Sequence, residues 1–253
     1  MNRKLYSSIL LILILCALPW DATAQYRNRS RSQASRMQER GVVVVVGAGI
    51  AAIKSDICGS WGCNNFGPNA SVGALYKVTP YLGVNANLDY VQLGAVEKDV
   101  NRTLNIAFES EVIQFSVTGV LNLLDSYAGS GNYRSSRKRF VVPYMRAGIG
   151  AVYYSATSFP GQGDLDDSQT TYDPERDYPA FAAVIPFGGG LRFRVNDEFS
   201  IAPELMYHIT TTDFLDNIGP RLGNAATKDH FGVAAIKLQY TPVIKNKLFS
   251  RKQ

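Results

Sequence analysis

Apolar and polar residues alternate along most of the chain between residues 41 and 241. From Phe199 to Ile209, every odd position except Pro203 is a large apolar residue, and the even positions include Glu204 and His208. A period of two places successive side chains on opposite faces of a β-strand. Eight such segments follow one another along the chain, at residues 42–53, 68–78, 81–96, 105–121, 139–155, 181–194, 199–212 and 229–241. Because tight turns join some neighbouring segments, the sequence predicts an all-β fold of eight antiparallel strands.

Alternation alone does not distinguish a soluble sandwich, which buries its apolar face, from a membrane barrel, which turns that face to lipid. Two features favour the barrel. The segments reach or exceed the 9–11 residues that a tilted strand needs to cross a bilayer. Aromatic residues recur near their ends, as at membrane interfaces: Tyr81, Tyr153, Tyr154, Phe181, Phe199 and Tyr240. We therefore expect an eight-stranded antiparallel transmembrane β-barrel that contacts outer-membrane lipids.

The N-terminus has the features of a signal peptide. Arg3 and Lys4 precede an apolar run from Ile9 to Leu18, and Ala22-Thr23-Ala24 forms a small-x-small cleavage site. The sequence thus divides into a signal peptide at 1–24, a basic flexible periplasmic segment at 25–40, the barrel at 41–242 and a basic tail at 243–253. This division favours export to the cell outer membrane.

The polar faces of the strands carry full charges. The side chains expected to point inward are Lys77, Asn85, Asn87, Asp89, Arg146, Arg192, Arg194, Glu204, His208 and Lys237. An eight-stranded barrel is only wide enough for side chains to fill its interior. An isolated buried charge costs several kcal/mol, so these charges must pair with one another. We expect a polar network that plugs the barrel.

Cys58 and Cys63 are the two cysteines that remain once the predicted signal peptide is removed. An even number of cysteines in an exported protein favours a disulfide. Their four intervening residues do not match the C-x-x-C spacing of a redox pair. The sequence leaves open whether they are bonded to each other.

Charges differ between the two sets of connections. The four longer loops (54–67, 97–104, 156–180 and 213–228) hold eleven acidic and six basic residues, whereas the two tails and the remaining turns hold thirteen basic and four acidic ones. One interpretation is that these basic residues flank the membrane and favour anionic lipid headgroups. Alternatively they form a docking face for a periplasmic partner, in which Arg134, Arg137, Lys138 and Arg139 take part.

Motifs for catalysis and cofactor binding are weak. Gly47–Ala52 imitates a dinucleotide-binding fingerprint, but a loop follows it where a helix would be needed. His208 is expected to be an interior hydrogen-bonding residue, and no serine stands in a nucleophile-elbow motif. We therefore expect no enzyme, catalytic residue, cofactor, metal site, nucleotide or nucleic-acid partner.

Four segments carry a resemblance to a known family: 106–116, 142–150, 183–192 and 211–217. In these strand ends, glycines and turns the chain resembles small outer-membrane barrels of Bacteroidota, a family that includes PorG of the type IX secretion system. The resemblance implies a non-enzymatic barrel that anchors a periplasmic ring of PorK- and PorN-like proteins. A surface-exposed structural or adhesive barrel that acts through its acidic loops, in particular 156–180, is the alternative.

Overall fold

The structure is a computed structural model that describes residues 41–55, 58, 62–79, 81–97, 105–124, 139–161, 172–174, 176–196, 198–217 and 228–242. The predicted signal peptide, the 25–40 segment and the 243–253 tail lie outside the described residues. The strands are β1 (Gly41–Lys54), β2 (Asn64–Asn65), β3 (Gly67–Lys77), β4 (Leu82–Val96), β5 (Ile106–Asn122), β6 (Val141–Pro160), β7 (Ala180–Arg194), β8 (Phe199–Thr210) and β9 (His230–Tyr240). In this described part of the chain, no helix is long and apolar enough to cross a membrane.

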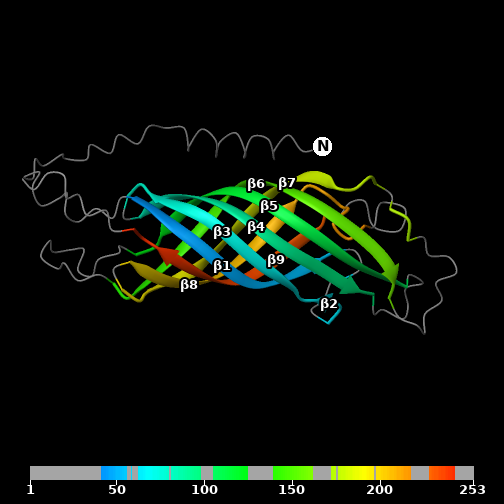
Figure 1. Cartoon of the computed structure of the whole chain (residues 1–253), viewed down its shortest axis with the longest axis horizontal. Helices are drawn as coiled ribbons and strands as arrows, with labels where there is room; N and C mark the ends of the chain where they lie inside the picture. Colours follow the sequence, from blue (N-terminus) through cyan, green and yellow to red (C-terminus); the bar gives the residue numbers. More distant parts are fainter. Residues whose placement is uncertain are drawn as a thin grey trace, which may run out of the picture. The chain divides into compact units, whose positions relative to one another are not determined.

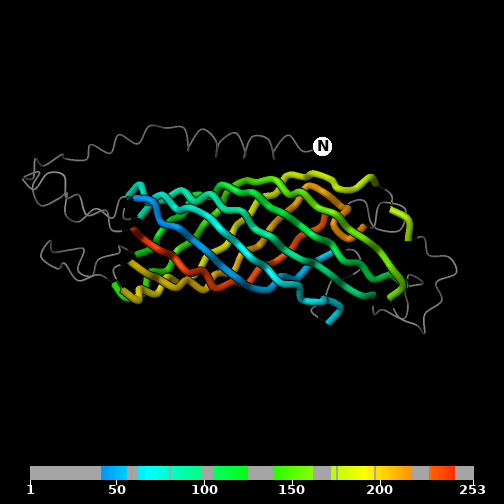
Figure 2. Tube along the Cα trace, viewed as in Figure 1, coloured from blue at the N-terminus to red at the C-terminus, as the bar shows by residue number. Residues whose placement is uncertain are grey.

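The eight long strands form a closed antiparallel barrel. Each pairs with its neighbours in sequence, and β9 closes the barrel by pairing with β1 over eleven residues, from Val44↔Tyr240 to Lys54↔His230. The strands are strongly tilted in Figure 1, and Figure 2 shows the last strand beside the first. We call the end where β1 begins and β9 ends the terminal end, and the opposite end the loop end.

The predicted strands agree with the observed ones to within two residues at most boundaries, which confirms the predicted fold. The largest difference is β6, which was expected to end at residue 155 but continues to Pro160. It stays paired with β5 as far as Ile106↔Pro160. The assignment of 156–160 to a loop was therefore wrong, because alternation continues there with Ala156 buried and Thr157 exposed.

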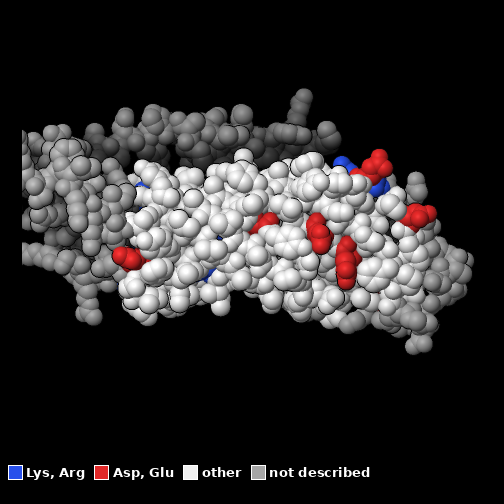
Figure 3. All heavy atoms as spheres, in the orientation of Figure 1, with Lys and Arg blue, Asp and Glu red and all other residues white. Residues whose placement is uncertain are grey.

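The outward face of the barrel is apolar. Ile149, Leu205 and Ile236 are 73%, 66% and 64% exposed. On β5 this belt runs over nine residues, from Ile113 to Leu121, which matches the span of a tilted transmembrane strand. Beyond Ile113, Glu109 and Glu111 point outward, and the acidic residues visible in Figure 3 gather mainly toward the loop end.

Aromatic pairs mark both edges of this belt. Tyr153 and Phe181 lie 4.8 Å apart between ring centroids toward the loop end, and Phe199 and Tyr240 lie 5.0 Å apart at the terminal end. Tyr154, which the sequence placed with these residues, instead points into the barrel and is fully buried. That expectation was wrong because consecutive strand residues face opposite sides, so only one of two neighbouring tyrosines can face outward.

Candidate functional site

The barrel interior is filled at two levels by different kinds of side chain. Around its middle lies a charged centre, which we define as Tyr144, Arg146, Glu204 and Lys237. Toward the loop end lies an apolar group that we call the loop-end cluster. Its principal members are Ile53, Val91, Leu93, Phe108, Val112, Val152, Tyr154, Val184, Leu215 and Phe231.

Glu204 holds the charged centre together. Its Oε1 atom lies 3.0 Å from the Arg146 guanidinium and 3.0 Å from the Lys237 ammonium, while Oε2 accepts a 2.8 Å hydrogen bond from the Tyr144 hydroxyl. The alternation of β6, β8 and β9 directs these side chains inward, and all four are buried. A buried carboxylate is tolerated only when opposite charges and donors surround it, as they do here.

Gly188 leaves space for one contact of this centre. A Cβ atom at this position would overlap the backbone oxygen of Leu205 and would lie 2.8 Å from the Met206 sulfur. That sulfur accepts a 3.1 Å hydrogen bond from Nε of Arg146. The glycine therefore allows Met206 to reach the arginine and fix its orientation.

A second polar layer lies on the terminal side of the charged centre. Arg192 donates to Gln239 at 2.7 Å and to Asn122 at 3.1 Å, and its guanidinium lies 5.0 Å from the centroid of the Tyr144 ring. Sequence analysis missed Tyr144, Gln239 and Asn122, although each occupies an inward position of its strand. The alternation of inward and outward positions along each strand was the signal that could have identified them.

The remaining space at this level is too small for a passage. The cavity lined by Arg146, Arg192, Glu204, Lys237 and their neighbours has a volume of about 10 Å³. A single water needs at least about 10–15 Å³, so the cavity is at most the size of one water. The side chains of the charged centre thus fill the space around this cavity.

Asn85, Asn87 and Asp89 point into the lumen from β4. Asp89 accepts a 2.5 Å hydrogen bond from Asn87. Lys77 and Arg194 stand at the ends of β3 and β7, near the terminal end, and are only partly buried. The structure therefore brings Arg146, Glu204 and Lys237 together, whereas Lys77 and Arg194 belong to the terminal rim.

His208 differs from its expected role. It is 3% exposed, and neither ring nitrogen has a hydrogen-bond partner among the residues that the structure describes. Its ring stacks on Phe231, with centroids 4.4 Å apart and planes 6° from parallel. The expectation of an interior hydrogen-bonding histidine was wrong, because its neighbour across the strands is an aromatic ring.

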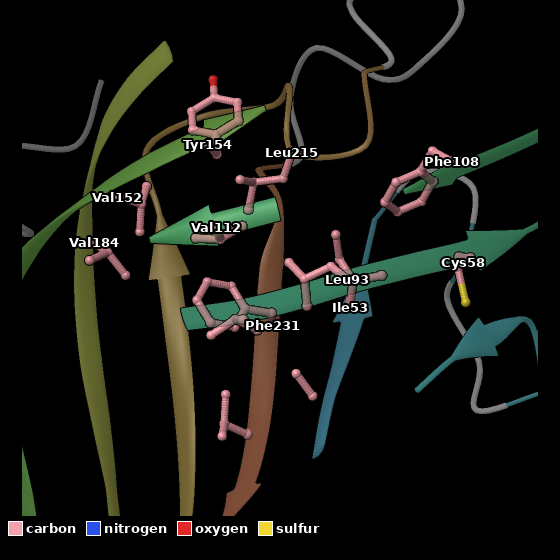
Figure 4. Packing of buried hydrophobic residues seen from close by; sticks show 14 of the residues in the cluster. Ile53, Cys58, Leu93, Phe108, Val112, Val152, Tyr154, Val184, Leu215 and Phe231 are labelled. Atoms are coloured by element: carbon pink, nitrogen blue, oxygen red, sulfur yellow. The ribbon is translucent and has the colours of Figure 1, made fainter. Parts of the chain in front are cut away.

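The loop-end cluster is also a departure from the polar lumen that the sequence predicted. Figure 4 shows side chains from several strands converging there, with Leu215 above and Phe231 below. Phe108, Leu215 and Phe231 are at most 1% exposed. At this level Val91 and Leu93 of β4 and Phe108 and Val112 of β5 point inward, with Ser110 as a polar exception, so the interior is largely apolar.

A short segment after β8 covers this cluster. We call Thr211–Asn217 the mouth segment. The backbone N–H of Leu215 donates to the Asp229 carboxylate at 2.9 Å, and the Asp229 N–H donates to the Thr212 carbonyl at 3.1 Å. Tyr178 donates to the Phe214 carbonyl at 3.0 Å, and burial raises the pKa of its hydroxyl, which keeps it protonated. These bonds hold the Leu215 side chain in the mouth.

Cys58 and Cys63 form a disulfide at the loop end, the pairing that the sequence favoured. Asn64 lies next to it and donates from its amide nitrogen to the Cys58 sulfur at 3.1 Å. The Asn64 oxygen accepts the Ile53 backbone N–H at 2.7 Å. This side-chain hydrogen bond links the disulfide loop to β1 beyond Gly67, where β3 begins.

The predicted docking residues are only partly visible. Arg139 lies just before β6 at the terminal end, whereas Arg134, Arg137 and Lys138 lie outside the described residues. Within the described part of the chain, no group of three or more His, Cys, Asp and Glu residues is arranged to hold a metal ion.

Comparison with known proteins identifies the architecture. A family model described as outer membrane protein beta-barrel domain matches residues 8–240. A search of curated proteins found no matching sequence. Among solved structures, the chain is similar to Neisserial surface protein A (12% identity, 79% of this chain and 96% of that one, TM-score 0.44). It is also similar to the attachment invasion locus protein Ail of Yersinia pestis, with 14% identity over 79% of this chain and 98% of that one and a TM-score of 0.41. The outer membrane enzyme PagL is similar with 12% identity over 78% of this chain and 99% of that one and a TM-score of 0.35.

Proposed function

The chain belongs to the outer membrane protein β-barrel family, and we propose that it is a closed, non-enzymatic barrel that anchors a periplasmic secretion assembly to the outer membrane. The observation that carries this proposal is the double closure of the lumen, by the charged centre and by the loop-end cluster. A barrel closed in this way works through its surfaces. Its resemblance to PorG favours the type IX secretion system as the assembly.

The terminal end is the surface best suited to such an anchor. Outer-membrane barrels have short periplasmic turns and longer external loops, so we assign the terminal end to the periplasm. Three segments join the barrel at this end, because β1, β5, β6 and β9 begin or finish there. They are residues 25–40, 125–138 and 243–253. These segments are rich in Arg and Lys, which suits an acidic face of a periplasmic partner.

Crosslinking in cells with mass-spectrometric identification of neighbours tests the proposal. The wild-type protein should crosslink to periplasmic ring proteins of the PorK and PorN kind. A variant with Arg134, Arg137, Lys138 and Arg139 changed to Ser should lose these neighbours. A matched variant with Asp164, Asp166, Asp167 and Asp173 changed to Ser should retain them. Absence of periplasmic neighbours, or equal loss in both variants, would contradict the proposal.

The construction of the loop end favours a second candidate, a surface-exposed structural or adhesive barrel. The β5–β6 hairpin continues beyond the apolar belt, and the disulfide and mouth segment are built into the barrel. Such a platform is suited to presenting the acidic loops. Deletion of residues 162–171 should abolish adhesion to a surface if this candidate is right, and should leave the periplasmic crosslinks unchanged if anchoring is the function.

A further inference from the structure

The outward wall of β1, β7, β8 and β9 contains a groove of about 470 Å³. The strand register brings Ala52, Gly232, Tyr207 and Phe187 into one row across these four strands. Ala52 and Gly232 are small, so the wall is low at these two positions. Phe187 and Tyr207 form a raised side, with ring centroids 5.5 Å apart. The adjoining row toward the middle of the barrel adds Leu205, which also lines the groove.

The floor of the groove is backbone. Ile53, Gly188 and Met206 line it, although their positions on the strands point inward. With no large side chain at Ala52 or Gly232 to cover it, the sheet itself is accessible from outside. A hydrocarbon chain could therefore lie closer to the barrel axis here than along the raised side formed by Phe187 and Tyr207.

A cation stands at the loop-end limit of the groove. Lys54 lines it, is exposed and lies directly opposite His230, whose ring is 5.7 Å from that of Tyr207. Lys54 forms no ion pair with any residue in the described part of the chain. On the far side of the barrel, the corresponding region above the apolar belt carries Glu109 and Glu111, and Glu111 accepts a 3.2 Å hydrogen bond from Tyr90.

We propose that this groove binds one acyl chain of an anionic lipid of the outer leaflet, whose phosphate contacts Lys54. The apolar groove suits the acyl chain of such a lipid, and Lys54 at the loop-end limit of the groove suits its phosphate. The acidic β4–β5 side offers the opposite charge and would repel the same headgroup. The binding is therefore expected on one side of the barrel only.

Native mass spectrometry of the purified full-length protein in detergent micelles tests the site. Phosphatidylglycerol and phosphatidylcholine with identical acyl chains serve as probes. We expect one retained phosphatidylglycerol per barrel, and Lys54→Gln should weaken its binding about fivefold, the effect of one Lys near an anionic lipid. Gly232→Leu should fill the groove and reduce retention to the phosphatidylcholine level.

Two matched variants control for general effects on the barrel. Gly119→Leu places the same side chain at another outward glycine. At both Gly119 and Gly232 the nearest neighbour of an added Cβ is a carbonyl oxygen 3.9 Å away, so the barrel accommodates either change. Glu111→Gln removes a charge on the acidic side. Both controls should retain the lipid, and folding of every variant is checked by heat-modifiable electrophoretic mobility. Equal retention in Gly232→Leu and Gly119→Leu, or equal retention of the two lipids by the wild type, would overturn the proposal.

Discussion

The two levels of the lumen are closed by different interactions. Toward the loop end, Phe231 and Leu215 are fully buried among apolar side chains, whereas at the middle Arg146 and Lys237 share the Glu204 carboxylate. Apolar packing is built from many small contacts and loses stability in proportion to the atoms removed. The charged centre is different, because removal of the Glu204 carboxylate leaves Arg146 and Lys237 buried without their shared ion-pair partner. One barrel therefore combines an apolar filling, whose stability falls gradually as side chains are truncated, with a charged filling that depends on a single carboxylate.

Glu204→Ala should have the largest effect on stability. Loss of the carboxylate leaves two buried cations unpaired, which is expected to lower the free energy of unfolding by about 3–5 kcal/mol. Urea titration of the folded barrel in micelles measures this change. The control is Glu198→Ala, at an exposed turn position, which should cost less than about 0.5 kcal/mol. Similar costs for the two variants would show that the charged centre is not a coupled unit.

Leu215→Ala tests the apolar closure. Truncation of this fully buried side chain leaves a cavity in the mouth and should cost about 2–5 kcal/mol. The same substitution at Leu205, which is 66% exposed on the outer wall, is expected to cost less than about 1 kcal/mol because detergent or lipid can occupy the space. If the two leucines gave equal losses in the same urea titration, the mouth segment would not be packed against the lumen.

Replacing Cys58 and Cys63 by Ser should have an intermediate effect. The two cysteines are five residues apart, and closure of such a short loop in the unfolded chain corresponds to about 2 kcal/mol. The loss is measured by unfolding in urea, and thiol reduction of the wild-type protein should reproduce it. A reduced wild type as stable as the oxidised protein would show that the loop end does not depend on this bond.

His208→Phe should have the smallest effect. The histidine contributes an aromatic stack on Phe231 and has no hydrogen bond to a described residue, so a phenyl ring can replace it. We expect the free energy of unfolding to change by less than about 1 kcal/mol, because no polar interaction is removed. A loss comparable with that of Glu204→Ala would place His208 within the charged centre.

The strands were predictable because alternation depends on a local property, the opposite orientation of successive side chains. The inward positions of Arg146, Glu204 and Lys237 followed from the same rule. Their contacts with one another did not, because the register that brings Arg146 and Glu204 together joins residues 58 positions apart in sequence. Tyr154 was assigned to the membrane interface because it is aromatic, although its position in the strand directs its side chain into the barrel.

The apolar loop-end cluster was the least predictable part of the interior. On β5, Val112 points inward and its sequence neighbour Ile113 points outward, so hydrophobicity alone does not identify the inner face. Leu215 belongs to no strand, and nothing local indicates that it turns into the mouth. Its position depends on Asp229, which comes fourteen residues later.

The bonds between the mouth segment and Asp229 have a practical consequence. Asn217, before the loop, donates to Ser158, and Asp229, after it, bonds to Thr212 and Leu215, so both ends of the intervening loop are fixed on the barrel. The hydrogen bond to the Leu215 backbone comes from Asp229, which follows this loop. A foreign epitope grafted between these two fixed ends should be displayed at the loop end of the barrel while the apolar cluster beneath it stays packed.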